Sequence, residues 1–281
     1  MVPSKIFEQV NSIGHFGLGA ILEKQDGKHA AGVLIFDVNE GTNGEENFTA
    51  AVIRWLHVAK EFRKNGVSDE LMKEFFRVMD DAGIEHIICD VPMPEEYDFL
   101  CAYLEEWGFK FTLANIYEVE AQLGEILEKP VFSGQKASAK TIALKEAPAL
   151  SFRQFIGNMK KHHDVLNIIT ANVSEYDSDV SCVYMNGSSV EGAMLIKAYN
   201  SGELELLFMR AISNAQKVMA DLLLFSAHAA AKKYSPETTV HIICRIEAAA
   251  GVIQKLFPDR QPLLVRRGYF NNTPSTVNKE V

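Results

Sequence analysis

The sequence has few cysteines, and none of them belongs to a metal or disulfide motif. Its 281 residues include Cys89, Cys101, Cys182 and Cys244, and no two of these form a C-x-x-C pair. Zinc sites and small disulfide-rich domains usually show such pairs, so the sequence argues against both. Three of the four lie in apolar runs, where a free thiol behaves as a small hydrophobic residue. We expect free thiols and no metal site.

Long hydrophobic runs are also missing. No stretch reaches the roughly eighteen uncharged apolar residues that a membrane span needs. The first residues lack the charged, apolar and small-residue parts of a signal peptide. We therefore expect a cytoplasmic protein without a membrane partner.

Basic residues do not outnumber acidic ones. The net charge is −9, and residues 1–135 carry 11 lysines and arginines against 24 aspartates and glutamates, whereas residues 136–281 carry 17 against 13. Nucleic acid requires a basic face, so it is not an expected partner. The acidic half fits a cationic partner such as an amine. The alternative is that these acidic residues simply form a solvated surface.

Hydrophobic periodicity predicts the same order of elements twice. Asp26-Gly27 and Asn186-Gly187 are hairpin signals in corresponding places, and residues 39–46 form a predicted polar loop. The predicted strands are 16–23, 30–38, 48–58, 84–91 and 109–119, then 182–185, 192–199, 203–210, 240–246 and 263–270. The predicted helices are 3–13, 68–82 and 95–107, then 147–163, 216–234 and 248–257.

Two short sequences recur and favour a duplication. His86-Ile-Ile-Cys89 recurs as His241-Ile-Ile-Cys244, and a Gly-aromatic pair follows each copy, at Gly108-Phe109 and Gly268-Tyr269. We therefore predict domains at 1–125 and 141–272, a linker at 126–140 and a flexible tail at 273–281.

A strand, a glycine-containing turn and a helix follow one another within residues 52–79. Residues 52–58 suit a half-buried strand, and from residue 69 the apolar positions follow a helical period. Gly66 lies in the turn between them, where it would let a ligand approach the backbone. The start of a helix presents unpaired N–H groups and a positive dipole end. The segment predicts an anion site suited to phosphate, and an ordinary helix start is the alternative.

The same segment resembles a family signature. Residues 63–68 read R-x-x-G-x-S, which resembles the R/Q-x-x-G-x-G/A pyrophosphate-binding loop of the GCN5-related N-acetyltransferases, abbreviated GNAT. Leu56-x-Val58 ahead of the loop resembles the family's L-x-V strand. With the repeated order of elements, the chain resembles a tandem GNAT protein. The resemblance implies an α/β fold with mixed sheets and two acyl-CoA N-acyltransferase-like domains.

The resemblance also implies a cosubstrate, acetyl-coenzyme A, and the residues that bind it. Main-chain groups of Leu56 and Val58 would pair with the pantetheine amides, and the loop amides would hold the pyrophosphate. No metal cofactor is expected. The implied cofactor-binding residues are Leu56, Val58, Arg63, Lys64, Asn65, Gly66, Val67 and Ser68.

The chain departs from the family pattern in three places, and the first is Ser68, where the loop usually ends in Gly or Ala. The tyrosine that usually protonates the leaving thiolate is replaced by Leu104, with Tyr103 one residue earlier. In the second half the loop position reads Ala215-Gln-Lys-Val-Met-Ala220, without arginine or glycine. We therefore expect the second half to have lost its coenzyme site.

Catalytic candidates are few. His57 is a candidate base because an imidazole accepts protons near neutral pH, and Tyr103 is a candidate acid. Tyr117 and Cys101 are weaker candidates. A histidine or tyrosine in a strand or helix is more often structural than catalytic, and Cys101 could act only with a lowered pKa, so structural roles stay open.

Two functions follow from these observations. The first is acetyl transfer from acetyl-coenzyme A to a small amine or a protein amino group. The alternative is a coenzyme-binding or interaction module that has lost its chemistry, which Leu104 motivates. The sequence leaves open whether the chain forms a homodimer.

Overall fold

The computed structural model describes residues 14–42, 47–160, 169–244, 254–259 and 263–272, together with the single residues Ile6, Glu8, Val10 and Gln261. The predicted helices at 3–13 and 248–257 lie mostly outside these ranges, and the predicted tail at 273–281 lies wholly outside them. No helix in the described ranges is long and apolar enough to cross a membrane.

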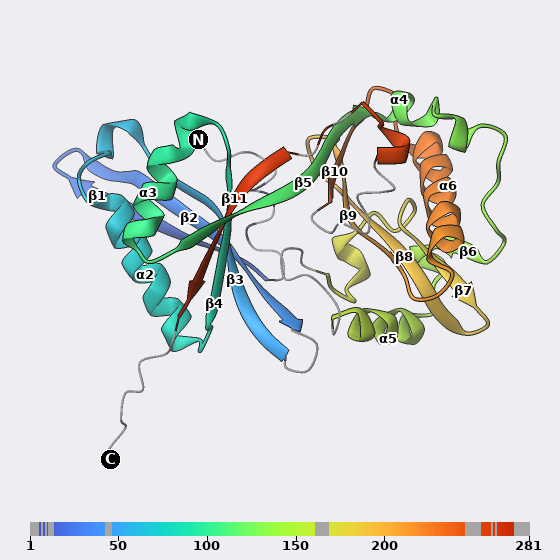
Figure 1. The fold of residues 1–281 in the computed structure, drawn as a ribbon, viewed down its shortest axis with the longest axis horizontal. Helices are drawn as coiled ribbons and strands as arrows, with labels where there is room; N and C mark the ends of the chain where they lie inside the picture. The colour runs from blue at the N-terminus through green and yellow to red at the C-terminus, as the bar shows by residue number, and fades with distance from the viewer. Residues whose placement is uncertain are drawn as a thin grey trace, which may run out of the picture. The chain divides into compact units, whose positions relative to one another are not determined.

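The chain divides into two compact units (Figure 1). Unit 1 contains Met1–Ala114 and Leu264–Val281, and unit 2 contains Asn115–Leu263. These units follow spatial contacts. The domain boundaries predicted above follow the order of the chain, and they stay a prediction about its duplication.

Unit 1 is a twisted mixed sheet covered by two helices. The strands β1, β2 and β3 are antiparallel neighbours, and β3 runs parallel to β4. Its elements are β1 (His15–Lys24), β2 (Gly27–Thr42), β3 (Asn47–Val58), η1 (Lys60–Phe62), α2 (Val67–Asp81), β4 (His86–Pro92), η2 (Glu95–Tyr97), α3 (Asp98–Glu106), the first part of β5 (Lys110–Gln122) and most of β11 (Leu263–Asn271).

Two predicted boundaries in unit 1 are wrong. The strand β2 continues to Thr42 instead of giving way to a loop after residue 38, because Asn39–Thr42 pair with the start of β3. Ladder hydrogen bonds outweigh the polar composition of that segment. The helix predicted at 95–107 begins as the separate 3-10 turn η2.

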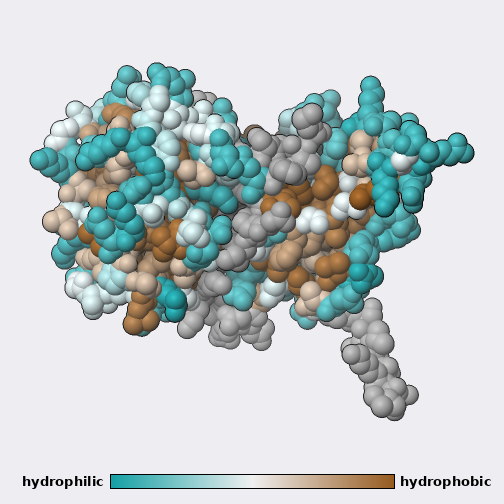
Figure 2. Space-filling view, turned by 180° about the vertical axis from the view of Figure 1, so that it is seen from behind, coloured by the Kyte–Doolittle hydropathy of each residue, from teal (hydrophilic) through white to brown (hydrophobic). Residues whose placement is uncertain are grey.

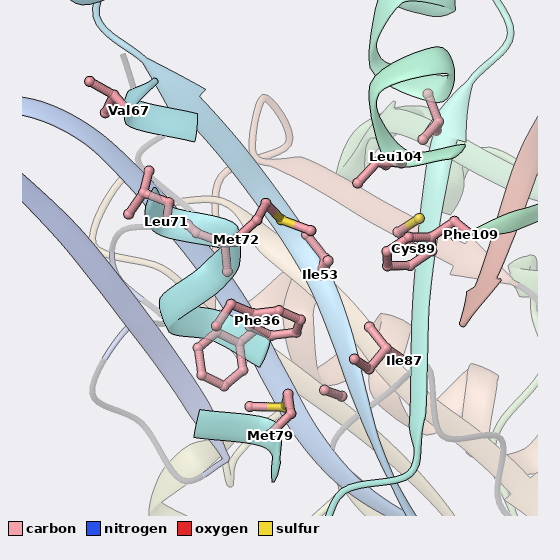
Figure 3. Packing of buried hydrophobic residues seen from close by; sticks show 14 of the residues in the cluster. Phe36, Ile53, Val67, Leu71, Met72, Met79, Ile87, Cys89, Leu104 and Phe109 are labelled. Carbon is pink, nitrogen blue, oxygen red and sulfur yellow. The ribbon is translucent and has the colours of Figure 1, made fainter. Parts of the chain in front are cut away.

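The core of unit 1 lies between α2 and the strands β2 and β3 (Figure 3). Met72, Phe75 and Met79 have no exposed surface and follow the helical period. The ring of Phe75 meets the ring of Phe36 edge to face at 5.1 Å. Burying this stripe fixes α2 against the sheet and thereby places its first turn.

The last strand of the chain belongs to unit 1. In Figure 1 the red β11 lies beside β4, and the two pair antiparallel from Val265 with Pro92 to Asn271 with His86. Phe270 packs on Phe76 with ring centroids 4.9 Å apart. Sequence order assigns this strand to the second half, yet it completes the sheet of the first unit.

Unit 2 repeats this architecture. The helix α6 packs on β7, β8 and β9, and the short strand β6 was not predicted. Its elements are α4 (Leu123–Leu127), η3 (Pro130–Phe132), β6 (Thr141–Ala143), η4 (Leu144–Glu146), α5 (Ala149–Lys160), η5 (Val173–Glu175), β7 (Cys182–Asn186), β8 (Ser189–Ala198), β9 (Leu204–Ala211), α6 (Ala215–Lys233) and β10 (Thr239–Cys244).

Both units share a bulge at the same place. The β2–β3 register shifts after Ile35, and the β8–β9 register shifts after Leu195. Each shift leaves one extra residue in the second strand of its pair. In each unit the parallel ladder with the next strand ends just before this extra residue, at Ile53 with Cys89 in unit 1 and at Leu206 with Ile242 in unit 2. These features confirm a duplication of the fold.

The two His-Ile-Ile-Cys segments that suggested a duplication do not occupy equivalent positions in their ladders. Val52 pairs with Ile88, whereas Glu205, at the equivalent position in unit 2, pairs with His241. The two His-Ile-Ile-Cys segments therefore lie in equivalent strands but two residues apart. Gly108 lies in a turn with φ 93°, while Gly268 lies within β11, so the Gly-aromatic pairs are not equivalent either.

Apolar side chains reach the surface of unit 1. In Figure 2, which views the molecule from behind, brown side chains gather on the unit drawn on the right. The exposed large apolar side chains of this unit are Phe16, Ile21, Leu22, Met93, Phe99, Leu113, Leu264 and Tyr269.

Candidate functional site

The separation of β3 from β4 forms the floor of the candidate site. The parallel ladder ends at Ile53 and Cys89, immediately before Arg54, the extra residue of the bulge. In Figure 3 the two strands run side by side near Ile87 and move apart toward Leu104. The last residues of β3 thus have one edge that β4 does not cover.

Main-chain groups of Leu56 and Val58 face this uncovered edge. The N–H of Ala59 donates to the carbonyl of Ala31 on β2 at 2.9 Å, so Ala59 faces β2. Because successive residues of a strand point their main-chain groups to opposite sides, those of Val58 and Leu56 point away from β2. The Nε of Arg63 donates to the carbonyl of Val58 at 3.1 Å. The edge therefore offers the amide groups that the resemblance assigns to the pantetheine.

The loop before α2 adopts left-handed backbone conformations. Lys64 has φ 64° and Gly66 has φ 74°, and both are exposed together with Asn65. The first bond of the helical ladder runs from Glu70 N to Gly66 O at 3.1 Å. The N–H groups of residues 67–69 precede that ladder and lie at the positive end of the helix dipole. A Cβ added at Gly66 would meet no atom within 4 Å, so open space adjoins the backbone here.

Close packing between the start of α2 and Gly32 of β2 holds this loop at the end of β3. A Cβ on Gly32 would lie 3.0 Å from the carbonyl oxygen of His57 and 3.1 Å from Val67 Cγ1. Only glycine admits the start of α2 this close to β2. Val67, which the sequence assigned to coenzyme binding, is 7% exposed and packs into the core, so only its main chain is available to a ligand.

His57 lies between Leu56 and Val58 on β3. Its side chain therefore points to the face of the sheet opposite to theirs. Burial, and to a lesser degree nearby positive charge that includes Arg63, lowers the pKa of its imidazole below the usual 6.5. A lowered pKa keeps the imidazole neutral at pH 7, which is the form that accepts a proton.

Tyr103 and Leu104 occupy different surroundings. The Tyr103 hydroxyl donates to Asp69 Oδ1 at 2.9 Å, and burial raises the pKa of this phenol to about 12. Leu104 is 2% exposed and belongs to the core of unit 1. The structure thus brings Tyr103 to the first turn of α2 and Leu104 into the core of unit 1.

The cysteines whose side chains the structure describes are buried thiols. Cys89, Cys101 and Cys182 are free and buried, as predicted, and the side chain of Cys244 is outside the described part. Burial raises the pKa of Cys89 to about 12 and also raises that of Cys101. The side chain of Tyr117 is likewise outside the described part. Across the described ranges, no group of three or more His, Cys, Asp or Glu is arranged to hold a metal.

A buried charged cluster beside the bulge was not predicted from the sequence. Asp37 on β2 is 1% exposed and accepts hydrogen bonds from Arg54 Nε and His15 Nδ1, both at 2.5 Å. Burial alone would raise the pKa of this carboxyl, but Arg54 and His15 outweigh it and hold the pKa low. The available signal was a single aspartate at an inward position of an apolar strand.

Unit 2 has the bulge but not the loop. Gly192 meets Val218 and Leu222 in the way that Gly32 meets Val67 and Leu71, which aligns the two helices. In this alignment α6 starts at Ala215, three residues earlier than α2. Its first turn therefore replaces the segment that corresponds to Lys64, Asn65 and Gly66 in unit 1.

The chain resembles known proteins in fold but not in sequence. No protein-family model matches the chain, and no curated protein sequence does. Among solved structures, a tandem GNAT protein from the clavulanic acid biosynthesis pathway matches with a TM-score of 0.61 at 10% identity, over 97% of this chain and 89% of that one.

Two further solved structures resemble the chain. A putative acetyltransferase from Pyrococcus horikoshii matches with a TM-score of 0.55 at 15% identity, over 95% of this chain and 76% of that one. A GCN5-related N-acetyltransferase from Kribbella flavida matches with a TM-score of 0.52 at 16% identity, over 86% of this chain and 57% of that one. The chain thus spans little more than half of the Kribbella protein. With a duplicated mixed sheet and a strand separation in each copy, the chain has the tandem GNAT fold.

Proposed function

We propose that unit 1 transfers an acetyl group from acetyl-coenzyme A to an amine, either a small molecule or a protein amino group. One observation carries the proposal: the uncovered edge of β3 is followed, after η1 and a short loop, by a helix start with unpaired amides. The edge offers main-chain groups of Leu56 and Val58, and the loop offers N–H donors to phosphate. Solved structures named as acetyltransferases share this fold.

The residues present fit the coenzyme on two counts. The backbone at Gly66 has open space beside it, so a pyrophosphate can approach the amides of residues 66–68. Arg63 and Lys64 add positive charge, and Ser68 is small enough to keep the approach open. Acetyl-coenzyme A, when bound, would supply the acetyl group as a thioester.

His57 is the proposed base. A protonated amine cannot attack a carbonyl, so the acceptor must lose a proton before it reacts. The neutral imidazole of His57, whose pKa is lowered by burial, can take that proton at pH 7. The acceptor would approach from the face of the sheet opposite α2, where this side chain points.

The proposal is tested by binding and turnover together. Titration calorimetry with acetyl-coenzyme A should show binding, and incubation with a panel of amines should release free coenzyme A thiol. Absence of binding would refute the proposal.

One observation favours a second candidate, a coenzyme-binding module without transferase activity. Leu104 fills the place of the family's tyrosine, and Tyr103 donates its hydrogen bond to Asp69. Tight coenzyme binding without acetylation of any amine in a broad panel would favour this candidate.

A further inference from the structure

Positive charge gathers around the loop before α2, although residues 1–135 are strongly acidic as a whole. Five of their 11 lysines and arginines lie in the two segments 22–29 and 59–66, against three acidic residues. The local balance is therefore the reverse of that of the surrounding sequence. The basic residues are Lys24, Lys28, Lys60, Arg63 and Lys64, and the acidic ones are Glu23, Asp26 and Glu61.

The lysines of this group are not neutralised by their neighbours. Across the described ranges, the four lysines take part in no ion pair, although the next cations along α2 do. Lys73 pairs with Glu70 at 2.8 Å and Arg77 pairs with Glu74 at 2.6 Å. Along this part of the chain, the lysines without an ion pair thus precede α2, and the cations of α2 itself are paired.

Lys24 is held in place by an aromatic ring. Its Nζ lies 4.5 Å from the centroid of the Phe62 ring, a distance that suits a cation–π contact. Phe62 is 4% exposed and directly precedes Arg63. The ring of His29 lies 6.3 Å from the same ring. The tip of the β1–β2 hairpin is therefore docked on the loop, and the ammonium of Lys24 is fixed beside it.

The hairpin tip extends past the end of β3. The β2–β3 ladder ends with Gly32 opposite Val58, and residues 27–31 continue beyond it alongside η1. A coenzyme that runs from the separated strands past Val58 to the loop would have its pyrophosphate at the start of α2. Its ribose 3′-phosphate would lie beyond the pyrophosphate, within reach of a cation that stands beside the loop, as Lys24 does.

We propose that Lys24 binds the 3′-phosphate of the coenzyme's ribose and makes unit 1 select coenzyme A over dephospho-coenzyme A. The proposal rests on the proposed function, because it assumes that the coenzyme lies along β3 and the loop. Unit 2 provides a contrast. Near the start of its helix, Glu191 accepts hydrogen bonds from Asn186 and Ser213, so an acidic group stands there.

The test compares two ligands on the full chain. Calorimetry would give the dissociation constants of coenzyme A and dephospho-coenzyme A for the wild type, Lys24→Gln and Lys24→Arg. We expect Lys24→Gln to weaken coenzyme A binding about fivefold, since one charge-assisted contact with phosphate is lost. Binding of dephospho-coenzyme A should not change. Lys24→Arg keeps the charge and the ring contact, and should keep the selectivity.

Lys73→Gln is the matched control, because it removes the same charge from an exposed but paired position of unit 1. It should change neither constant. Equal weakening of both ligands by Lys24→Gln, or no effect on either, would overturn the proposal while leaving the proposed function intact. A wild type that binds neither ligand would overturn both.

Discussion

Asp37 and Arg54 are joined by a hydrogen bond of 2.5 Å at the residue where β3 bulges. Asp37 is 1% exposed and also accepts from His15, so its charge is balanced within the fold. A bulge leaves one residue without a partner, and here that residue's side chain is tied back to the neighbouring strand. The ion pair therefore fixes the place where β3 leaves β4.

Asp37→Asn should destabilise the protein by about 3 kcal/mol at pH 7, because it leaves Arg54 without its buried partner. The folded state lowers the pKa of this carboxyl, so its contribution is present above the unfolded pKa of about 3.9 and is lost as the pH falls through the folded value. Urea unfolding of variant and wild type should show the difference at pH 7 and a smaller one below pH 4. Asp26→Asn, at an exposed hairpin position, is the control. Equal stability of Asp37→Asn and wild type at pH 7 would contradict this account.

Gly268→Ala should destabilise unit 1 although the residue lies near the end of the chain. A Cβ there would come within 2.7 Å of Cys89 Sγ and 2.8 Å of Phe111. Overpacking of this kind costs about 1–3 kcal/mol. Gly19→Ala on β1, whose added Cβ would meet no atom within 4 Å, should stay within about 0.5 kcal/mol of wild type. Urea unfolding measures both, and equal effects of the two variants would show that the close approach is not restrictive.

His57→Gln should lower kcat/KM by about 10²–10⁴, the usual effect of losing a general base. The dissociation constant for acetyl-coenzyme A should not change, because the side chain points away from the coenzyme's edge. The pKa of His57 is lowered by burial, so the acid limb of the wild-type pH profile should lie below pH 6.5. His86→Gln on β4 is the control. A wild-type profile without an acid limb, or full activity of His57→Gln, would remove this histidine from the mechanism.

Tyr103→Phe should lower the transfer rate by far less than the about 10²-fold loss expected for a general acid. Its hydroxyl already donates to Asp69, and its pKa of about 12 makes it a weak acid. Steady-state rates at saturating coenzyme measure the effect. A loss as large as that of His57→Gln would show that Tyr103 donates the proton.

The local features of the site could be predicted because they depend on short stretches of sequence. Residues 52–58 carry the strand pattern, Gly66 marks the turn, and the apolar period of α2 is regular. The strand ends and the first turn of α2 fall close to their predicted places, since local pattern determines both.

The pairing partners could not be predicted, because they depend on contacts between distant segments. Nothing in the pattern of residues 263–271 distinguishes pairing with β4 from pairing within the second half. The same holds for Asp37, whose partners His15 and Arg54 lie on two other strands. The His-Ile-Ile-Cys repeat misleads in the opposite way. Its identical residues suggest equivalent positions, but the two segments lie two residues apart in the ladders of their units.

The most direct test of the account is calorimetric titration of coenzyme A into the wild type, Gly66→Val and Gly83→Val. Both glycines have positive φ, 74° and 66°, and open space beside them, at opposite ends of α2. Each substitution therefore adds similar backbone strain, about 1–2 kcal/mol, and only the first places a side chain beside the loop amides. We predict one coenzyme per chain for the wild type and Gly83→Val, and none for Gly66→Val. Equal binding by the two variants, or no binding by the wild type, would contradict the account.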